Sequence, residues 1–522
     1  MAVCPKYKID SNDTGLRYAE EVCLKQLPTL AADGFDPTWI ALEPNSYSDF
    51  GGQITTVARN PINPSRQRKK GKVTDLEASG GFQQDLTFFN SRDLLQGFMF
   101  ADLREKKTTA PNNGTGQAIT AVDAATKTFT TAAGGGTGFA AGHLVVAEGF
   151  TNVANNGVKT VASSTGTTVV VAENLVDEAA PPAGARLAVV GYQGASGTLS
   201  IALNGGLVRL VSTAGVNFTT LGLIPGEWIF IGGDLTANGF EDNGGFARIS
   251  VVASGYLEFD KVDWITPTAE AGTGKLINLY FGAVLRNESD PALIKRRTYQ
   301  LERTLGQDVN GTMSEYLVGA VANELTLNVP QAEKVTLDLT FMACDHQART
   351  GAQGVKGGTR VGVVEGDAYN TSNDFVRIKL ASVSNVDAAP TPLFAFATDL
   401  TLTVNNNASG NKAIGVLGAF EVSVGTFEVG GSLTAYFASA ESVQAVRNNA
   451  DVTIDAIMVV NNQGVNQGVL YDVPLLSLGN GRLNVEQDQP ITIPLDTNAA
   501  ESKFGHTLLW QFFPLLPNAA SL

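Results

Sequence analysis

The residue types that could carry catalysis or bind a metal are few in this chain and widely spaced. It contains three histidines (His143, His346 and His506) and three cysteines (Cys4, Cys23 and Cys344). A metal site or a Cys/His nucleophile needs several such side chains at a short, defined spacing. Cys344-Asp345-His346 comes closest, but its spacing fits neither chemistry. We interpret it as a loop at the end of a strand.

Other catalytic and phosphate-binding motifs are incomplete or missing. Gly272–Lys275 (GTGK) resembles half of a phosphate-binding loop, but it lacks the hydroxyl residue after the lysine and the first glycine. Neither HExxH nor GxSxG occurs. Acidic pairs such as Asp260 and Asp263 arise by chance in a chain with 51 acidic residues. We therefore predict that the protein is not an enzyme and has no cofactor, catalytic residue or metal site.

One cluster of cations stands out in the segment Ala58–Lys72 (ARNPINPSRQRKKGK). Its members are Arg59, Arg66, Arg68, Lys69, Lys70 and Lys72. Because the segment also holds two prolines, we predict a basic, extended loop between two strands. Three interpretations remain: contact with nucleic acid, docking on an acidic surface of a neighbouring subunit, or an unstructured solvated loop. Of these we favour docking.

Composition narrows the class of protein further. Hydrophobic residues make up 43% and charged residues 17% of the chain, so a folded protein is expected. The net charge of −15 argues against nucleic-acid binding and suits either simple solubility or a surface past which nucleic acid slides. The start, MAVCPKYKID, lacks the apolar run of a signal peptide, and no stretch approaches about 18 apolar residues. We therefore expect no membrane span. The low, odd number of cysteines favours free thiols and assembly in a reducing cytoplasm.

The elements that must position these residues follow from an internal repeat. Asn323–Ala343 aligns with Gly479–Ala499 at an offset of 156 (499 − 343). Upstream, Leu86–Phe98 parallels Thr434–Val446 at an offset of 348 (434 − 86). The two offsets predict two copies of one unit, the first of which carries roughly 190 extra residues. A unit that presents the same surfaces twice suits a ring-building protein.

Each copy combines alternating strands with one short helix. Apolar and polar residues alternate through Lys334–Phe341, and the pattern recurs at Ile491–Leu495. Asn90 and Ser439 are the expected helix caps. The prediction is a mainly β fold with α+β elements: two tandem β-sandwich or barrel-forming units, each with one short helix. Pairing with a neighbouring subunit would cover the edges of their sheets.

The extra residues, 108–287, are rich in Ala, Gly, Thr and Val and contain a repeat of their own. Phe129–Thr131 matches Phe218–Thr220, and Gly142–Val146 matches Gly226–Phe230. These matches predict two tandem β modules, at about 120–193 and 208–284, that decorate the outside of whatever the units build. The predicted parts are an N-terminal arm (1–34), the first unit (35–107 with 288–345), the inserted region (108–287), a linker loop (346–370) and the second unit (371–522).

Several segments follow one another in the order of a known family. Thr55–Phe98 (TTVARNPINPSRQRKKGKVTDLEASGGFQQDLTFFNSRDLLQGF) reads as a strand, a long polar loop, a GG-containing strand and a DLL helix. Thr298–Leu305, Tyr316–Asp345 and Leu402–Val443 correspond to later parts of that family. Together they resemble the tail tube (major tail) proteins of long-tailed bacteriophages, of the siphophage type. The resemblance covers 36–103 and 295–514 and leaves the inserted region outside.

The resemblance implies a structural virion protein. In that family the sheets of neighbouring subunits join edge to edge into a closed barrel, rings stack into a hollow tube, and phage DNA passes through the bore without specific binding. The implied partners are further copies of this chain and the tape measure, tail terminator and tail tip proteins, with no membrane. The implied location is the virion tail, assembled in the host cytoplasm.

The resemblance also gives the basic loop a role. Arg59, Arg66, Arg68, Lys69, Lys70 and Lys72 would form the stacking loop that reaches the adjacent ring, whereas the lumen-facing residues stay unassigned. Family members usually carry one unit and form hexameric rings, so a chain with two units favours homotrimeric, pseudo-sixfold rings over hexamers. The alternatives are a β-rich adhesin or host-surface-binding tail protein, and a carbohydrate-active tail enzyme with paired carboxylates in an aromatic cleft.

Overall fold

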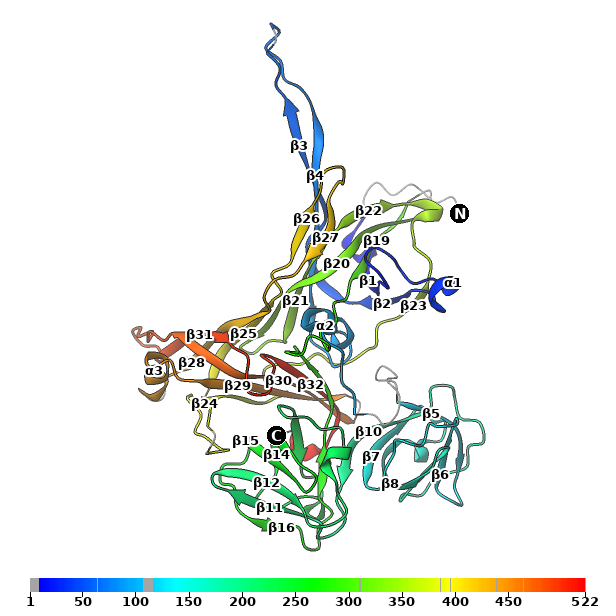
Figure 1. The fold of residues 1–522 in the computed structure, drawn as a ribbon, viewed down its shortest axis with the longest axis vertical. Helices are drawn as coiled ribbons and strands as arrows, with labels where there is room; N and C mark the ends of the chain where they lie inside the picture. Colours follow the sequence, from blue (N-terminus) through cyan, green and yellow to red (C-terminus); the bar gives the residue numbers. More distant parts are fainter. Residues whose placement is uncertain are drawn as a thin grey trace.

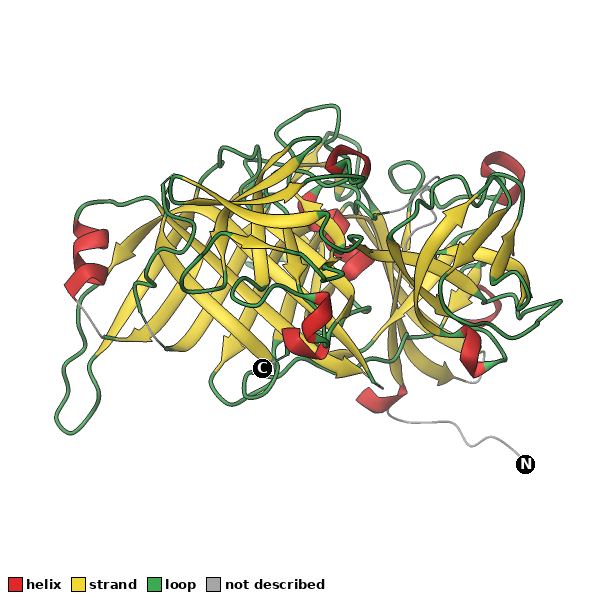
Figure 2. Ribbon diagram, turned by 90° about the horizontal axis from the view of Figure 1, so that it is seen from below, coloured by secondary structure: helices red, strands yellow, loops and turns green. Residues whose placement is uncertain are grey.

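The computed structural model describes residues 9–62, 64–106, 116–308, 311–384, 386–394, 396–437, 440–462 and 464–521. Ser439, an expected helix cap, and the first residues of the predicted N-terminal arm and inserted region lie outside these ranges. The described residues form 32 strands and three short α-helices, which confirms the predicted mainly β class (Figures 1 and 2).

Eight strands form one continuous antiparallel sheet, the main sheet, to which both predicted units contribute. In order across the sheet they are β3 (Pro44–Arg59), β4 (Lys69–Asp85), β21 (Thr336–Ala343), β20 (Gly311–Pro330), β25 (Ala397–Asn405), β28 (Glu428–Tyr436), β31 (Thr492–Ala499) and β30 (Val465–Asn480). The first four strands come from the first predicted unit and the last four from the second. We call the pairing of β20 with β25, which joins the two halves, the seam.

The repeated sequence segments form elements of equal length in the two halves. Helices α2 (Arg92–Met99) and α3 (Ala440–Arg447) both have eight residues and start 348 residues apart (440 − 92). Strands β21 and β31 also have eight residues each and start 156 apart (492 − 336). By their partners on β21 and β31, Phe82 and Leu433 correspond, which is an offset of 351 (433 − 82). The gapless upstream alignment therefore holds for the helices and is wrong for the preceding strand, because three extra residues precede α2.

Each half of the main sheet is covered by an outer layer. The first outer layer contains β1 (Thr14–Glu20), β2 (Thr38–Leu42), β19 (Tyr299–Asp308), the start of β20, β22 (Asp345–Arg349) and β23 (Thr359–Val361). The second contains β24 (Phe375–Ser382), β29 (Val452–Asn462), the start of β30, β32 (Leu509–Leu516) and β18 (Ala283–Arg286). The segments 1–34 and 346–370, predicted as an arm and a linker loop, thus supply the strands β1, β22 and β23; the first also holds α1 (Leu30–Asp33).

The largest hydrophobic core lies between the main sheet and the outer layers and includes residues of both halves. Helix α2 buries its predicted apolar face there. Its N-cap position is Ser91, whereas the side-chain amide of Asn90, the predicted cap, donates to the Asp85 carbonyl at 2.8 Å. Asn90 therefore closes the turn between strand and helix.

The inserted region forms two small β modules with separate cores. Module one contains β5 (Gln117–Asp123), β6 (Thr128–Thr131), β7 (His143–Glu148), β8 (Gly157–Ser164), β9 (Thr168–Val171) and β10 (Arg186–Gln193). Module two contains β11 (Leu199–Asn204), β12 (Leu207–Ser212), β13 (Trp228–Ile231), β14 (Gly245–Val252), β15 (Tyr256–Val262), β16 (Glu270–Ala271) and β17 (Asn278–Tyr280). The pairing of β10 with β17 joins the modules.

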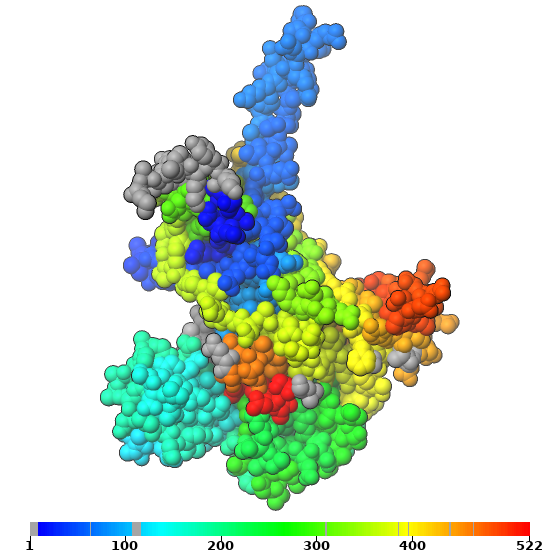
Figure 3. Space-filling view, turned by 180° about the vertical axis from the view of Figure 1, so that it is seen from behind, coloured from blue at the N-terminus to red at the C-terminus, as the bar shows by residue number. Residues whose placement is uncertain are grey.

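A long hairpin projects from one end of the molecule. It is the continuation of β3 and β4 beyond the main sheet, and we call its residues Gln53–Thr74 the arm; Figure 3 shows it standing clear of the body. A shorter hairpin of β26 (Ser409–Lys412) and β27 (Ala419–Ser423) lies beside the base of the arm. We call this end the arm end, and the opposite end of the main sheet the distal end.

Candidate assembly surfaces and a buried charge network

The six predicted site residues lie together on the arm, and all are exposed. Arg59 ends β3 opposite Lys69 at the start of β4, and Lys72 lies opposite Val57. Arg66 and Arg68 lie in the turn, where Arg68 Nε donates to Asn60 Oδ1 at 3.3 Å. None of the six forms an ion pair with another described residue, and no acidic residue occurs between Gln53 and Thr74. The arm therefore offers unpaired positive charge.

The hairpin of β26 and β27 braces the base of the arm. Lys412 Nζ forms ion pairs with Asp75 and with Glu77, the latter at 3.2 Å. The hydrogen bond from Lys412 lowers the pKa of the Asp75 carboxyl. On β27, Val422 is buried against Cys344 and Val321 of the first half. The second half of the chain thus holds the arm of the first half in place.

The seam shows how two units of this kind join. Along it, Leu327 lies opposite Leu402 and Val329 opposite Leu400, and all four side chains are buried. The outer edge of β30 has no such neighbour among the described residues.

The segment that continues β30 is 481–486. At the offset of 156, its Leu483 and Val485 correspond to Leu327 and Val329 of the seam, yet they are 38% and 69% exposed. Across the sheet β3 pairs only with β4 among the described strands. The main sheet therefore ends in two open edges, at β3 and at β30. The edge that continues β30 exposes Leu483 and Val485, whereas the corresponding residues of the seam, Leu327 and Val329, are buried.

One face of the main sheet is polar, and outside the arm its described strands carry no lysine or arginine; Lys412 and Lys334, from neighbouring segments, pair with Glu77 and Asp85 at its margins. Hydrogen bonds run across this face: Gln83 and Asn328 both donate to the Asp338 carboxylate, at 3.0 and 2.7 Å. Thr326 and Thr403 face each other at the seam. The carboxylates on the face are Glu77, Asp85, Glu324, Asp338, Asp399, Glu428 and Asp496.

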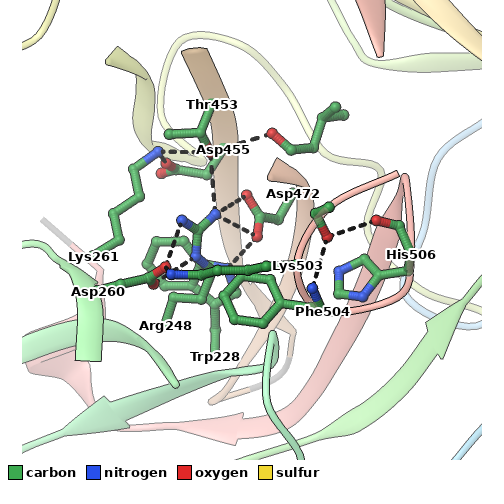
Figure 4. A network of polar contacts seen from close by, with 12 residues as sticks. Trp228, Arg248, Asp260, Lys261, Thr453, Asp455, Asp472, Lys503, Phe504 and His506 are labelled. Carbon is green, nitrogen blue, oxygen red and sulfur yellow. Dashed lines mark hydrogen bonds and ion pairs between the residues drawn. The ribbon is translucent and has the colours of Figure 1, made fainter. Parts of the chain in front are cut away.

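Module two meets the second outer layer through buried charges centred on Arg248 of β14 (Figure 4). Arg248 Nε lies 2.9 Å from Asp260 Oδ1 within the module, and its Nη1 lies 3.1 Å from Asp472 Oδ2 on β30. Trp228 Nε1 donates to the same Asp472 oxygen at 3.1 Å. All four side chains are buried. One guanidinium thus joins the inserted region to the second half of the chain.

Lys261 of β15 extends the network. Its Nζ pairs with Asp455 on β29, and Arg377 Nη2 of β24 lies 2.6 Å from Asp455 Oδ2. Arg377 also pairs with Asp263 of module two. A buried charge that loses its partner costs several kcal/mol. Module two is therefore anchored to the second outer layer by buried charges.

Burial and neighbouring charges set the pKa values in the network. Burial alone would raise the pKa of Asp455, but the charges of Arg377 and Lys261 outweigh it and hold that pKa below its ordinary 3.8. Burial lowers the pKa of Lys261 to about 8. Burial also raises the pKa of Asp472, although Arg248 opposes it. At neutral pH Lys261 and Asp455 are both charged, so they link two parts of the fold.

The residues that the sequence offered for chemistry are dispersed. Asp260 and Asp263 bind different arginines, Lys275 binds Glu270 at 3.3 Å, and Cys344 is buried after β21. The predicted loop at Cys344–His346 is wrong for Asp345 and His346, which are the first two residues of β22; only Cys344 lies between β21 and β22. Within the described residues no group of three or more His, Cys, Asp and Glu side chains could hold a metal ion.

The other two histidines are core residues. Burial lowers the pKa of His143 to about 4 and that of His506 to about 3. Both are therefore neutral at pH 7, and neither has the pKa of a general base that works at that pH. Their burial is typical of structural histidines.

Sequence reasoning missed the charge network, although a signal was present. Asp455 interrupts the apolar run of β29 (VTIDAIMVV), and Asp472 interrupts that of β30 (VLYDVPLL). An aspartate inside such a run needs a buried cationic partner. The sequence alone could not name the partners, because Arg248 and Lys261 lie more than 190 residues away.

Comparison with known proteins gives the family. No helix in the described parts of the chain has the length and apolar character that crossing a membrane requires. A search of curated proteins finds no match. The model of the family described as "Phage tail tube protein" matches residues 11–499, nearly the whole chain and both halves of the main sheet. The chain therefore belongs to the phage tail tube protein family, as a structural protein of the virion tail.

Proposed function

We propose that this chain assembles into stacked rings that form a hollow tail tube, through which phage DNA passes into the host. The observation that carries the proposal is the seam. Within one chain it already makes the edge-to-edge sheet pairing that a closed ring needs between chains. Since the equivalent edges are open, repeating the pairing around a ring would satisfy them all.

The seam also supplies the register of the joint between chains. Val329 lies opposite Leu400, which lies opposite Leu433. The counterpart of Leu400 is Tyr47, because Tyr47 lies opposite Phe82, the equivalent of Leu433. The counterpart of Val329 is Val485. We therefore expect Val485 of one subunit to lie opposite Tyr47 of the next.

A chain with two such halves favours a ring of three chains. Three copies supply six units of four main-sheet strands each, joined alternately by seams within chains and by joints between chains. The seam within a chain and the joint between chains differ in sequence, so the ring is pseudo-sixfold. Self-assembly of this kind needs no enzymatic activity, in keeping with a structural tail protein.

The polar face of the main sheet is the proposed wall of the bore. It combines Thr, Asn, Ser and carboxylate side chains, and its only lysines among the described residues outside the arm, Lys334 and Lys412, are paired with carboxylates at its margins, so it repels phosphates. DNA would then pass without specific binding. Thr326, Asp338 and Thr403, at or beside the seam, are the lumen residues that we expect.

The arm is the proposed contact with the adjacent ring. Its six cations, Arg59, Arg66, Arg68, Lys69, Lys70 and Lys72, project from an otherwise acidic chain, so an acidic surface of another copy is the complementary partner. Assembly in the host cytoplasm, and contacts with tape measure, terminator and tip proteins at the ends of the tube, complete the proposal.

A disulfide trap tests the joint. In a Cys4→Ser, Cys23→Ser background, Tyr47→Cys with Val485→Cys should give covalently closed three-chain rings on oxidation of assembled tubes. The matched control pairs Val485→Cys with Ile54→Cys, seven residues further along β3, about 23 Å away at strand spacing. Tubes in which the first pair fails to cross-link between chains, or in which the control links equally well, would contradict the register.

A further inference from the structure

The hairpin of β26 and β27 occupies in the second half the place that the arm occupies in the first. It connects β25 to β28, whereas the arm connects β3 to β4, and these are corresponding neighbours in the main sheet. The two hairpins differ in chemistry: the arm is long and basic, and the shorter hairpin carries apolar residues at its tip. Both point toward the arm end (Figure 1).

The shorter hairpin is held in a fixed direction. Lys412 binds the two carboxylates at the base of the arm. Lys25 Nζ donates to the Ala419 carbonyl at 3.0 Å, and Arg296 lies 3.5 Å from Glu421. Such contacts at the base leave the tip in a defined position without covering it.

The tip is apolar and uncovered. Ile414 is fully exposed at 107%, and Val416, Leu417 and Phe420 are also exposed. Four large apolar side chains within seven residues are unusual on a solvated loop, and exposed apolar patches of this kind mark contact surfaces. In a stack of rings the arm end of one subunit meets the distal end of another copy.

The distal end holds a matching surface at the seam. Beside the start of β25, the ring of Phe396 is 71% exposed. Next to it lies a pocket of about 120 Å³, lined among others by Val329, Pro330, Ile378, Ala397 and Asp399. The acidic side chains around this end, Glu333 and Asp399, are exposed and complement the cations of the arm.

We propose that the tip of β26–β27 is a second stacking contact, which seats its apolar residues against Phe396 and the seam pocket of a second copy in the adjacent ring. This inference rests on the proposed tube function. Each chain then projects one basic and one apolar contact, three of each per ring. Because they differ, neighbouring rings match only at rotations that superpose like contacts, 120° apart rather than 60°.

The double variant Ile414→Asp/Leu417→Asp tests the proposal, with Ile265→Asp as the matched control. Ile265 is 92% exposed but lies on module two, away from the tip. We expect the double variant to keep the melting temperature and three-chain rings of the wild type but to form at least tenfold fewer tubes, whereas the control forms tubes normally. Normal tubes from the double variant would overturn the inference and leave the tube function intact.

A photo-cross-linking residue at position 414 identifies the acceptor. Tubes are assembled from an equal mixture of ¹⁵N-labelled and unlabelled protein. We expect mixed-isotope cross-links to peptides that contain Phe396 or Pro330. Cross-links only within one chain, or to any other surface, would overturn the inference. Wild-type protein that forms neither rings nor tubes would overturn the proposed function itself.

Discussion

Lys261 of module two and Asp455 of the second outer layer form an ion pair, and both side chains are fully buried. The pair explains why an insertion in the first half of the chain is built into the second half. With Arg248 and Asp472 it makes module two part of the wall that backs the main sheet. Module two and the second outer layer are thus joined by buried charges at this point.

Loss of the Lys261 charge should destabilise the fold. Lys261→Met leaves Asp455 buried with Arg377 as its remaining partner, so we expect a loss of about 3 kcal/mol in the free energy of unfolding. Urea unfolding followed by fluorescence measures it. The control is Arg186→Met in module one, which breaks the exposed pair with Glu148 and should cost about 0–1 kcal/mol. Equal losses in the two variants would contradict the structural role of the network.

Acid should reveal the contribution of Asp455. Its folded pKa lies below the ordinary 3.8, so the stability that it contributes is complete above that value and is lost as pH falls through the folded pKa. The difference in unfolding free energy between wild type and Asp455→Asn should therefore shrink as pH falls from 5 to below about 3. Unfolding titrations at each pH give the curve, and a difference that grows on acidification would count against it.

Neutralising the arm should block stacking and leave the fold intact. The four changes Arg66→Ser, Arg68→Ser, Lys69→Ser and Lys70→Ser remove exposed charges that bind no described carboxylate. We expect an unchanged melting temperature, normal three-chain rings and no long tubes in electron micrographs. Stacking of the wild type should weaken as salt rises, since salt screens exposed charges. Tubes of normal length from the variant would show that the arm makes no inter-ring contact.

A cation on the polar face should hinder DNA without harming assembly. Thr403→Arg places a guanidinium at the seam, on the proposed wall of the bore. We expect tubes of normal length but slower DNA ejection from particles that carry the variant, because each subunit would bind a phosphate. Thr213→Arg, on the exposed surface of module two, is the control and should eject normally. Equal ejection rates for the Thr403→Arg and Thr213→Arg particles would mean that the polar face does not line the bore.

The sequence predicted local elements better than their partners. The repeat located α2, α3, β21 and β31 because hydrophobic periodicity and turn residues act over short distances. It missed the three residues that precede α2, since a strand and helix keep their own registers while the loop between them varies. It also assigned β1 and β22 to an arm and a linker. The partner of β1 lies at least 279 positions away (299 − 20), and the partner of β22 is the start of β20, a strand whose end belongs to the main sheet.

Of the two proposed assembly surfaces, the sequence predicted one and missed the other. The cations of the arm were visible as a cluster in an acidic chain. The open edge at Leu483 and Val485 was not visible, because these residues resemble their buried counterparts, and only the structure shows that no described strand of the same chain covers them. The proposed partner of this edge, β3 of another copy, is inferred from the seam.

Electron microscopy of the purified protein, with averaging of end-on views, tests the central claim most directly. The proposed trimer predicts hollow rings with a pseudo-sixfold bore and three sets of outer modules, stacked into tubes. Six sets of modules per ring would mean six chains and would contradict the seam as the model for the joint between chains. Dispersed single subunits at high concentration, even after addition of a tail initiator complex, would contradict the tube itself.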